Sequence, residues 1–382
     1  MADIIYLDNN ATTRVDPRVI DKMVAVMRDD YGNPSSVHCL GTKASALVET
    51  GRAQVASLIG AQRHEILFTS GGTESDNAAI CGVLRADPSK RHIITTAVEH
   101  HAVHEQCVHL ESEGIEVTYL DVDCDGAPDL ATLRAVIRPD TALVCVMLAN
   151  NETGVILPVR EIAEIAHAAG VPVMSDAVNA LGKIPVNVEA LGVDLLSLSA
   201  HKVYGPKGIG ALFVRRGIAL RPYIMGGPQE RKRRGGTHNV PGIVGFGEAC
   251  AIAAEYGEEA RRRIAAMRDR LEAGVASICP DARVIGRNSP RVPNTSCICF
   301  AGCDAEVILM LLNERGICAS SGSACSSGAI EASGVMRAMK VPPEVAVGQI
   351  RFSFGRYNTE AEVDLLLAAI PEVAKRCALF AS

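Results

Sequence analysis

Short apolar segments recur between residues 65 and 200 and predict β-strands. They cover residues 65–70, 92–98, 116–122, 142–149, 171–177 and 195–200. Amphipathic segments separate the later ones; in REIAEIAHAAG (160–170), Ile162, Ile165 and Ala169 fall on one face of a helix. Strands that are apolar throughout and alternate with helices are typical of a mainly parallel sheet covered on both faces. The pattern therefore predicts an α/β fold.

The remainder of the chain predicts a second domain. From about Gly247 to Val275 the sequence is rich in Ala, Glu and Arg and lacks proline, which predicts one long helix leading into a smaller α+β unit. At 382 residues, the chain exceeds the size at which a single hydrophobic core stops growing. We therefore predict a large domain of residues 15–255 and a small domain formed by residues 1–14 and 256–382.

Composition excludes several classes of function. The net charge of −6, with both signs interspersed, argues against a nucleic-acid or membrane-surface partner. The apolar run 142–149 is too short to span a bilayer, and the start of the chain does not look like a signal peptide. Thirteen cysteines, an odd number, indicate reduced thiols in the cytoplasm rather than a disulfide framework.

Polar side chains follow the predicted strands at the point where each one ends. GGTESDN (71–77), EHHAV (99–103), NNETG (150–154) and HKVYGPKGIG (201–210) come directly after strands, and Asp176 ends another. The carboxyl ends of parallel strands meet at one sheet edge, where α/β proteins bind their ligands. Free backbone N–H groups at the helix start beside Thr73 suit a phosphate.

This combination fits a pyridoxal phosphate pocket. Lys202 can form a Schiff base with the cofactor aldehyde, and Asp176 can hold the pyridine nitrogen protonated, so that the ring becomes an electron sink. His100 can stack on the ring. Each residue alone could be a helix cap, a strand-end acid or a solvated lysine, and only the joint pattern indicates a cofactor site. Nucleotide sites fit poorly, because there is no P-loop motif and GPKGIG (205–210) lacks the dinucleotide spacing.

One cysteine lies where there is little to pack. Cys325 stands in CASSGSACSSG (318–328), a tract of small residues typical of a loop that can move. Most cysteines act as small buried hydrophobes, and Cys297, Cys299 and Cys303 of CICFAGC are interpreted in that way, because no C-x-x-C metal motif occurs in the chain. Cys325 is therefore the candidate reactive thiol.

Eight segments together resemble the cysteine desulfurases of the NifS/IscS-like family, over nearly the whole chain. They are YLDNNATT (6–13), YGNPSSVH (31–38), FTSGGTESDN (68–77), EHHAV (99–103), NNETGVI (150–156), SAHKVYGPKGIGAL (199–212), GGTHNVPGIVG (235–245) and SSGSACSSG (320–328). The resemblance implies a pyridoxal phosphate-dependent transferase of fold type I, with a mainly parallel sheet of the seven-stranded type, assembled as a homodimer. The short Cys325 loop and the end of the chain at Ser382 favour the nitrogen-fixation branch over the housekeeping one.

The same resemblance implies a role for each motif residue around the cofactor. Lys202 would be the Schiff-base lysine, Asp176 the partner of the pyridinium nitrogen and His100 the stacking ring, with a part in catalysis. The groups that would hold the phosphate are the Gly72 backbone, Thr73, Ser199, His201 and, from the other subunit, Thr237. Asn179 would bond the ring hydroxyl; many members carry Gln there, and Pro228 also stands where a glycine is common.

The resemblance also implies how the substrate is handled. Arg351 would bind the carboxylate of L-cysteine, and Asn151 would lie by cofactor and substrate. Cys325 would take the sulfur as a persulfide, leaving L-alanine, and pass it to an iron–sulfur scaffold protein for cluster assembly. No intrinsic metal site is implied, and Cys325 is the candidate for a transient iron–sulfur ligand. Two alternatives stay open: a selenocysteine lyase or other enzyme of the same fold, and a non-catalytic sulfur or metal scaffold.

Overall fold

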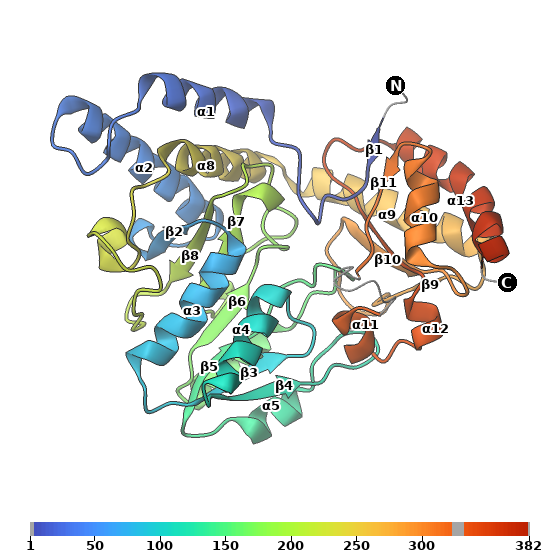
Figure 1. Ribbon diagram of the computed structural model, residues 1–382, viewed down its shortest axis with the longest axis horizontal. Coiled ribbons are helices and arrows are strands. Elements are labelled where there is room, and N and C mark those ends of the chain that lie inside the picture. The colour runs from blue at the N-terminus through green and yellow to red at the C-terminus, as the bar shows by residue number, and fades with distance from the viewer. Residues whose placement is uncertain (1–3, 323–331, 381–382) are drawn as a thin grey trace.

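A seven-stranded sheet forms the centre of the larger part of the molecule in the computed structural model, which describes residues 4–322 and 332–380 (Figure 1). The strand order is β2-β8-β7-β6-β5-β3-β4. The strands are β2 (Ile66–Thr69), β3 (His92–Thr96), β4 (Glu116–Leu120), β5 (Thr141–Cys145), β6 (Val173–Asp176), β7 (Leu195–Ser199) and β8 (Gly210–Val214). Only β8 runs antiparallel to its neighbours β2 and β7. The predicted α/β fold with a mainly parallel sheet is confirmed.

Helices cover both faces of this sheet, because alternate strand side chains point to opposite faces. In β2, Leu67 packs against α3 (Gly72–Ala86) and α4 (His101–Ser112), and Phe68 packs into the core on the other face. The helices on that other face are α1 (Pro17–Asp29), α2 (Cys39–Leu58), α5 (Leu130–Val136), α6 (Val159–Ala168), α7 (Val188–Leu191) and α8 (Val240–Glu255). Short 3-10 turns lie at η1 (Arg63–Glu65), η2 (Ala200–Lys202) and η3 (Gln229–Lys232).

Two features of the large sheet differ from the sequence prediction. The strand expected over 142–149 ends at Cys145, although the buried chain continues beyond it. Strand β8 was not predicted, because its glycine-rich approach is typical of a loop. At Gly210 a Cβ atom would lie 2.7 Å from the Cα of Gly71, so only glycine lets β8 pass this close to the turn that opens α3.

The smaller part of the molecule has its own core. Strands β9 (Arg283–Val284), β10 (Thr295–Cys299) and β12 (Gln349–Ser353) form an antiparallel sheet, and β1 (Ile5–Tyr6) pairs in parallel with β11 (Ile317–Cys318). Its helices are α9 (Glu258–Ile278), α10 (Ala305–Asn313), α11 (Gly334–Ala338), α12 (Pro343–Ala346) and α13 (Glu360–Phe380). The N-terminal Leu7 packs into this core with Ile298 and Phe352. The domain division at residues 14/15 and 255/256 stays a prediction.

The single long helix predicted over 247–275 is wrong, because the chain breaks between α8 and α9. Tyr256 ends α8 in an extended conformation, and Gly257 is the N-cap of α9. The Tyr256 ring lies 5.0 Å from the guanidinium carbon of Arg356, a residue that follows β12. Helix propensity over 247–275 carries no information about this contact, which is made by a residue distant in sequence.

Arg356 connects the two parts of the molecule. Its guanidinium carbon lies 3.8 Å from the ring centroid of Tyr204, and Nη2 lies 2.5 Å from Oδ2 of Asp16. Its backbone N–H donates to the Tyr204 hydroxyl at 2.7 Å. Tyr204 has a φ of +65°, which few residues with a side chain adopt, so this contact holds the chain just after Lys202 in an unusual conformation.

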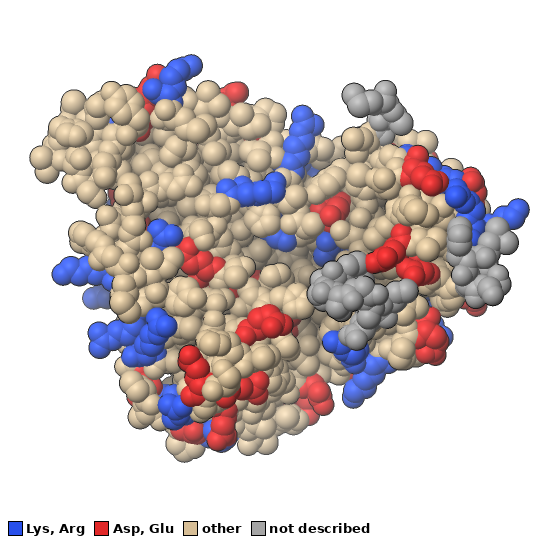
Figure 2. All heavy atoms as spheres, viewed as in Figure 1, with Lys and Arg blue, Asp and Glu red and all other residues tan. Residues whose placement is uncertain are grey.

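The surface carries charges of both signs. Figure 2 shows acidic and basic side chains interspersed over this face, in agreement with the small net charge. Within residues 4–322 and 332–380, no helix is both long and apolar enough to cross a membrane.

A buried ion pair anchors the segment that follows β8. Arg52 of α2 donates to both carboxylate oxygens of Glu230 at 2.7 and 2.8 Å, and the two side chains are only 4% and 2% exposed. The Phe68 N–H and the His238 ring complete the carboxylate's hydrogen bonds. Burial alone would raise the pKa of Glu230, but the bonds from Arg52 and His238 outweigh it and hold the pKa at about 2.

We predict that Glu230→Gln lowers the free energy of unfolding by about 3 kcal/mol at pH 7, because it leaves the buried Arg52 with only the half-exposed Glu49 as a charged partner. Glu49→Gln is the matched control: Glu49 also contacts Arg52, but it is 45% exposed and should cost less than about 0.5 kcal/mol. The folded pKa of Glu230 lies below its ordinary value of 4.5, so its contribution is complete above pH 4.5 and is lost as pH falls towards 2. Urea unfolding of the three proteins checks this, and equal losses from both substitutions would contradict it.

Candidate active site

Several residues singled out in the sequence lie at one edge of the large sheet. Asp176 ends β6, and its neighbour in the adjacent strand is Ser197 of β7, which leads through η2 to Lys202. His100 follows β3 and is the N-cap of α4. The positive charge of Lys202 and the carboxylate of Asp176 both act on the pKa of His100, so the three groups are close in space. The structure therefore brings the predicted lysine, acid and imidazole together.

The Lys202 amine is fixed by a hydrogen bond and has a lowered pKa, two properties that suit a nucleophile. Its Nζ donates to the backbone carbonyl of Asn10. Burial, followed by the positive charge of Arg351, lowers the pKa of Lys202 to about 8. An amine must be unprotonated to attack a carbonyl carbon, so a lowered pKa makes Lys202 reactive near neutral pH.

Asp176 and His100 are the two groups whose charges interact with each other and with this amine. Asp176 is 6% exposed and accepts a hydrogen bond from the Val178 N–H at 2.8 Å. Burial raises the pKa of Asp176, and the charges of His100 and Lys202 act against this rise. The Nδ1 atom of His100 accepts from the Ala102 N–H at 3.1 Å, and burial lowers the pKa of the ring. A neutral ring with its proton on Nε2 suits stacking on an aromatic ligand.

The start of α3 forms a cradle for an anion. Its first N–H groups have no partners within the helix. A Cβ at Gly72 would lie 2.7 Å from Val178, and one at Gly71 would lie 3.9 Å from the Ser199 hydroxyl, so the glycine turn adjoins Ser199 closely. Thr73 is exposed on the same turn. The free N–H groups at the start of α3 and the hydroxyls of Thr73 and Ser199 can donate hydrogen bonds to an anion, which fits a phosphate.

Charges around the cradle are consistent with this fit. Glu74, in the first turn of α3, is paired with Arg234 at 2.9 Å and accepts from the Ser70 N–H, so its charge is compensated. His201 hydrogen bonds to the Thr12 hydroxyl at 3.2 Å; burial and then Lys202 lower its pKa to about 4, which makes it a neutral partner. Thr237 is exposed between η3 and α8, and its predicted role in the neighbouring subunit stays a prediction.

Arg351 of β12 brings a buried guanidinium to the site from the small part of the molecule. Its Nη2 lies 2.9 Å from Oδ1 of Asp8, and its Nη1 donates to the Asn151 carbonyl at 3.1 Å. Its Nε is buried without a hydrogen-bond partner among the described residues. A buried donor without a partner is costly, so this edge of the guanidinium is suited to a ligand carboxylate.

Cys325 lies outside the described residues, but the chain leading to its loop is anchored at Arg351. The Ser320 and Arg351 backbones exchange hydrogen bonds at 3.3 and 2.6 Å. A Cβ at Gly322 would lie 2.1 Å from Oε2 of the buried Glu152, so a side chain at this position would displace Glu152. The described chain just before the loop therefore lies beside Arg351 of β12, the predicted carboxylate-binding residue.

The other cysteines are mostly part of the core. Cys297 and Cys299 are fully buried on the same face of β10, as predicted. All the described cysteines are free, and among them Cys39 and Cys124 are exposed. Burial raises the pKa of the Cys107 thiol to about 12 and also raises that of Cys145. Such thiols are poor nucleophiles.

Sequence reasoning missed several functional groups at the site. The backbone carbonyl of Asn10 accepts a hydrogen bond from the Lys202 amine. The Lys183 amine donates hydrogen bonds to the side chains of Asn10 and Asn179. Two buried acids, Asp76 and Glu99, lie near Asp176; burial raises the pKa of both, to about 8 for Glu99. Asp76 could have been noticed in the sequence, because it is an acidic residue among the apolar residues of the α3 segment. Asn10 lies in the segment YLDNNATT (6–13), for which the resemblance implies no role, and Lys183 lies in none of the eight segments.

Comparisons with known proteins agree with this chemistry. The family model for aminotransferase class-V matches residues 5–366. A cysteine desulfurase of Nostoc sp. strain PCC 7120 is 50% identical, with 98% of this chain and 93% of that protein covered. Cysteine desulfurase NifS of Azotobacter vinelandii is 46% identical, with 98% and 93% covered. A solved NifS-like protein superposes with a TM-score of 0.92 at 40% identity, covering 98% of this chain and all of that one.

We predict that Lys202 in the cofactor-free protein loses its proton with a midpoint near pH 8 instead of its ordinary value of 10.5. Trace acetylation with acetic anhydride across pH 6 to 11, followed by mass spectrometry of the Lys202 peptide, measures this midpoint. A reference peptide with one lysine serves as the control. Arg351→Met should raise the midpoint, because it removes a positive charge that disfavours the ammonium form. A Lys202 midpoint equal to that of the reference peptide would refute the assignment.

Proposed function

The chain belongs to the aminotransferase class-V family, and we propose that it is a pyridoxal phosphate-dependent cysteine desulfurase, which converts L-cysteine to L-alanine and transfers the sulfur as a persulfide. The observation that carries this proposal is the grouping of the Lys202 amine with Asp176, His100 and Arg351, whose charges act on one another. The relatives named above are cysteine desulfurases, which favours L-cysteine over selenocysteine as the substrate.

The cofactor would be held by the edge of the sheet. The phosphate would bind the Gly72 backbone, Thr73, Ser199 and His201, with Thr237 of the partner subunit completing the cradle in a homodimer. Asp176 would face the pyridinium nitrogen, His100 would stack on the ring and Asn179 would donate to the ring hydroxyl. When bound, pyridoxal phosphate supplies an electron sink for the bonds at the substrate α-carbon.

Lys202 and Arg351 would divide the handling of L-cysteine. Lys202 would hold the cofactor through its amine, and the same amine would be the group that accepts the α-proton of the substrate. A pKa of about 8 lets it hold and release that proton near neutral pH. Arg351 would bind the substrate carboxylate through its unpartnered Nε edge, with Asn151 beside it. If the substrate is held both at its amine and at its carboxylate, its orientation is fixed, and the bond from its α-carbon to the α-proton can face Lys202.

Sulfur transfer would require the thiolate of Cys325. The thiolate attacks the substrate sulfur, so that a sulfur–sulfur bond forms on Cys325 and the bond from sulfur to Cβ breaks. The electron pair left on Cβ takes up a proton, and L-alanine leaves. The persulfide would then pass to an iron–sulfur scaffold protein in the cytoplasm. The likeness to NifS supports assembly of nitrogenase clusters as the pathway served.

The decisive test of this function is Cys325→Ala. We expect the variant to bind L-cysteine and change its visible absorption, because Lys202 and the cofactor are intact, but to release no L-alanine. Cys124→Ala, which removes an exposed thiol elsewhere, should keep the wild-type rate. Alanine is measured by chromatography and the spectrum by stopped flow. Release of alanine and sulfide by Cys325→Ala at the wild-type rate would overturn the proposed transfer.

Arg351→Ala should raise KM for L-cysteine about 100-fold, because a buried charge-assisted contact to the carboxylate is worth about 2–4 kcal/mol. The yellow colour of the bound cofactor should remain. Arg376→Ala, which removes a half-exposed arginine of α13, is the control and should leave KM unchanged. Steady-state kinetics over a wide range of L-cysteine concentration checks this, and an unaltered KM in Arg351→Ala would exclude the carboxylate role.

A further inference from the structure

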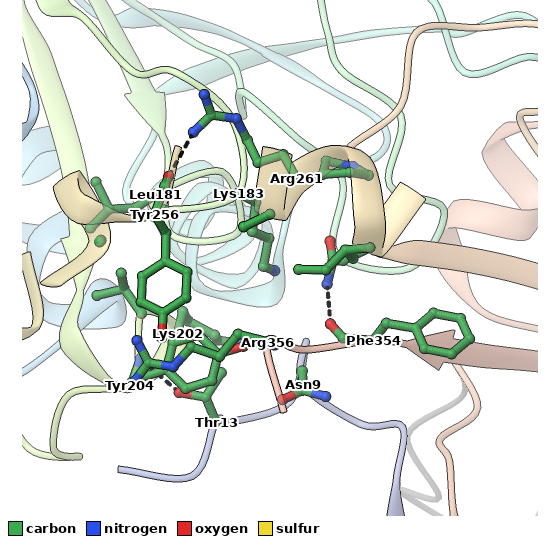
Figure 3. A pocket seen from close by; sticks show the side chains of 17 residues that line it. Asn9, Thr13, Leu181, Lys183, Lys202, Tyr204, Tyr256, Arg261, Phe354 and Arg356 are labelled. Atoms are coloured by element: carbon green, nitrogen blue, oxygen red, sulfur yellow. Dashed lines mark hydrogen bonds between the residues drawn. The ribbon is translucent and has the colours of Figure 1, made fainter. Parts of the chain in front are cut away.

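Lys183 places a second amine beside the site, in a position that the mechanism above does not use. Lys183 is half-buried, and together with Lys202 it lines a cavity of about 50 Å³ (Figure 3). The charges that act most strongly on it are those of Lys202 and Arg351, both positive, and these add to the effect of burial in lowering its pKa. A half-buried amine near two positive charges is disfavoured, and the hydrogen bonds of Lys183 to Asn10 and Asn179 offset that cost.

The Lys183 amine determines which way the Asn179 amide points. Nζ donates to Oδ1 of Asn179 at 2.5 Å, and Nδ2 of Asn179 donates to the Asn150 carbonyl at 3.0 Å. A flipped amide would place its NH₂ group against the amine and its oxygen against a carbonyl, so only one orientation is favourable. In that orientation, the second N–H of Nδ2 is available as a donor.

The Lys183 amine also hydrogen bonds to Asn10, the residue whose backbone carbonyl accepts a hydrogen bond from Lys202. Nζ of Lys183 donates to Oδ1 of Asn10 at 2.7 Å, and Asn294 donates to the same oxygen at 3.0 Å. The Asn10 amide nitrogen donates to the Thr295 hydroxyl at 2.8 Å and to a backbone carbonyl, so both ends of the side chain are satisfied. The backbone carbonyl of Asn10 then points at the Lys202 amine. Lys183 therefore contacts both Asn10, which adjoins the Lys202 amine, and Asn179, which is predicted to adjoin the cofactor ring.

We propose that Lys183 is a positioning residue for the cofactor. The Lys183 amine orients Asn179 to donate a hydrogen bond to the ring hydroxyl of the cofactor. It also fixes Asn10, whose backbone carbonyl accepts the hydrogen bond from Lys202. This inference rests on the proposed function, because the ring hydroxyl belongs to the cofactor. It assigns Lys183 no contact with substrate and no proton transfer. Its effect is exerted through two amide side chains.

The test uses the holoenzyme and the variant Lys183→Met, which keeps the length of the side chain and removes its donors. We expect about tenfold faster loss of cofactor on dilution, a fold-change equal to about 1.4 kcal/mol, and a displaced visible absorption maximum, because the hydrogen bond to the ring hydroxyl is weakened. Lys375→Met, at an exposed lysine of α13, is the matched control and should show neither change. A wild-type rate of loss together with a wild-type spectrum in Lys183→Met would overturn the proposal.

Two further variants separate positioning from simple destabilisation. Lys183→Gln retains N–H donors without the charge and should restore part of the cofactor retention; it also carries the test if Lys183→Met does not fold. In the Asn179→Ala background, Lys183→Met should accelerate cofactor loss less than it does alone, since part of its effect passes through Asn179. Fully additive effects would contradict this.

Failure of this inference is distinguishable from failure of the proposed function. Borohydride reduction of the wild-type holoenzyme should attach a pyridoxyl group to Lys202, as mass spectrometry would detect. Absence of that label would reject the proposed function itself. A label on Lys202 combined with unaltered cofactor binding in Lys183→Met would reject only the role of Lys183.

Discussion

The hydrogen bonds of Asn10 are the constraint on which the geometry of the site depends. This residue is fully buried, its side chain joins the Lys183 amine to Thr295 of β10, and its backbone carbonyl receives Lys202. Its backbone N–H donates to Ser353 of β12. One residue near the N-terminus thus links Lys183 and the Lys202 amine to two strands of the small sheet. In a buried environment each of these bonds is strong, and an unmade one is costly, so the parts are held in one arrangement.

A second contact works in the same direction. Arg356 lies against the Tyr204 ring and is paired with Asp16, while Tyr204 itself stands two residues after Lys202. Arg351 reaches the site from β12, the strand that leads to Arg356. The contact between Arg356 and Tyr204 therefore helps to fix the position of Lys202 relative to Arg351, in addition to the hydrogen bonds within the site. The arrangement supplies preorganisation before any ligand arrives.

The parts of this structure that could be predicted from sequence are those with a local signal. Buried strands appear as apolar runs, and the residues that follow them, such as His100 and Lys202, meet at one edge because parallel strands share a direction. The break between α8 and α9 could not be predicted, since it depends on the distant Arg356. Strand β8 was hidden by glycines that a close approach to Gly71 requires. Lys183 and Asn10 act through long-range hydrogen bonds that leave no periodic pattern.

The burial of the cysteines has a consequence for the fidelity of sulfur delivery. A protein that generates persulfide sulfur risks modifying itself, because any accessible thiolate competes with the intended acceptor. Cys107, Cys145 and Cys250 are enclosed in the large part of the molecule with raised pKa values, so they are neither reachable nor ionised. Folding thus insulates most of the chain's own thiols from its product. The exposed Cys39 and Cys124 are the places where stray sulfur would accumulate first during prolonged turnover.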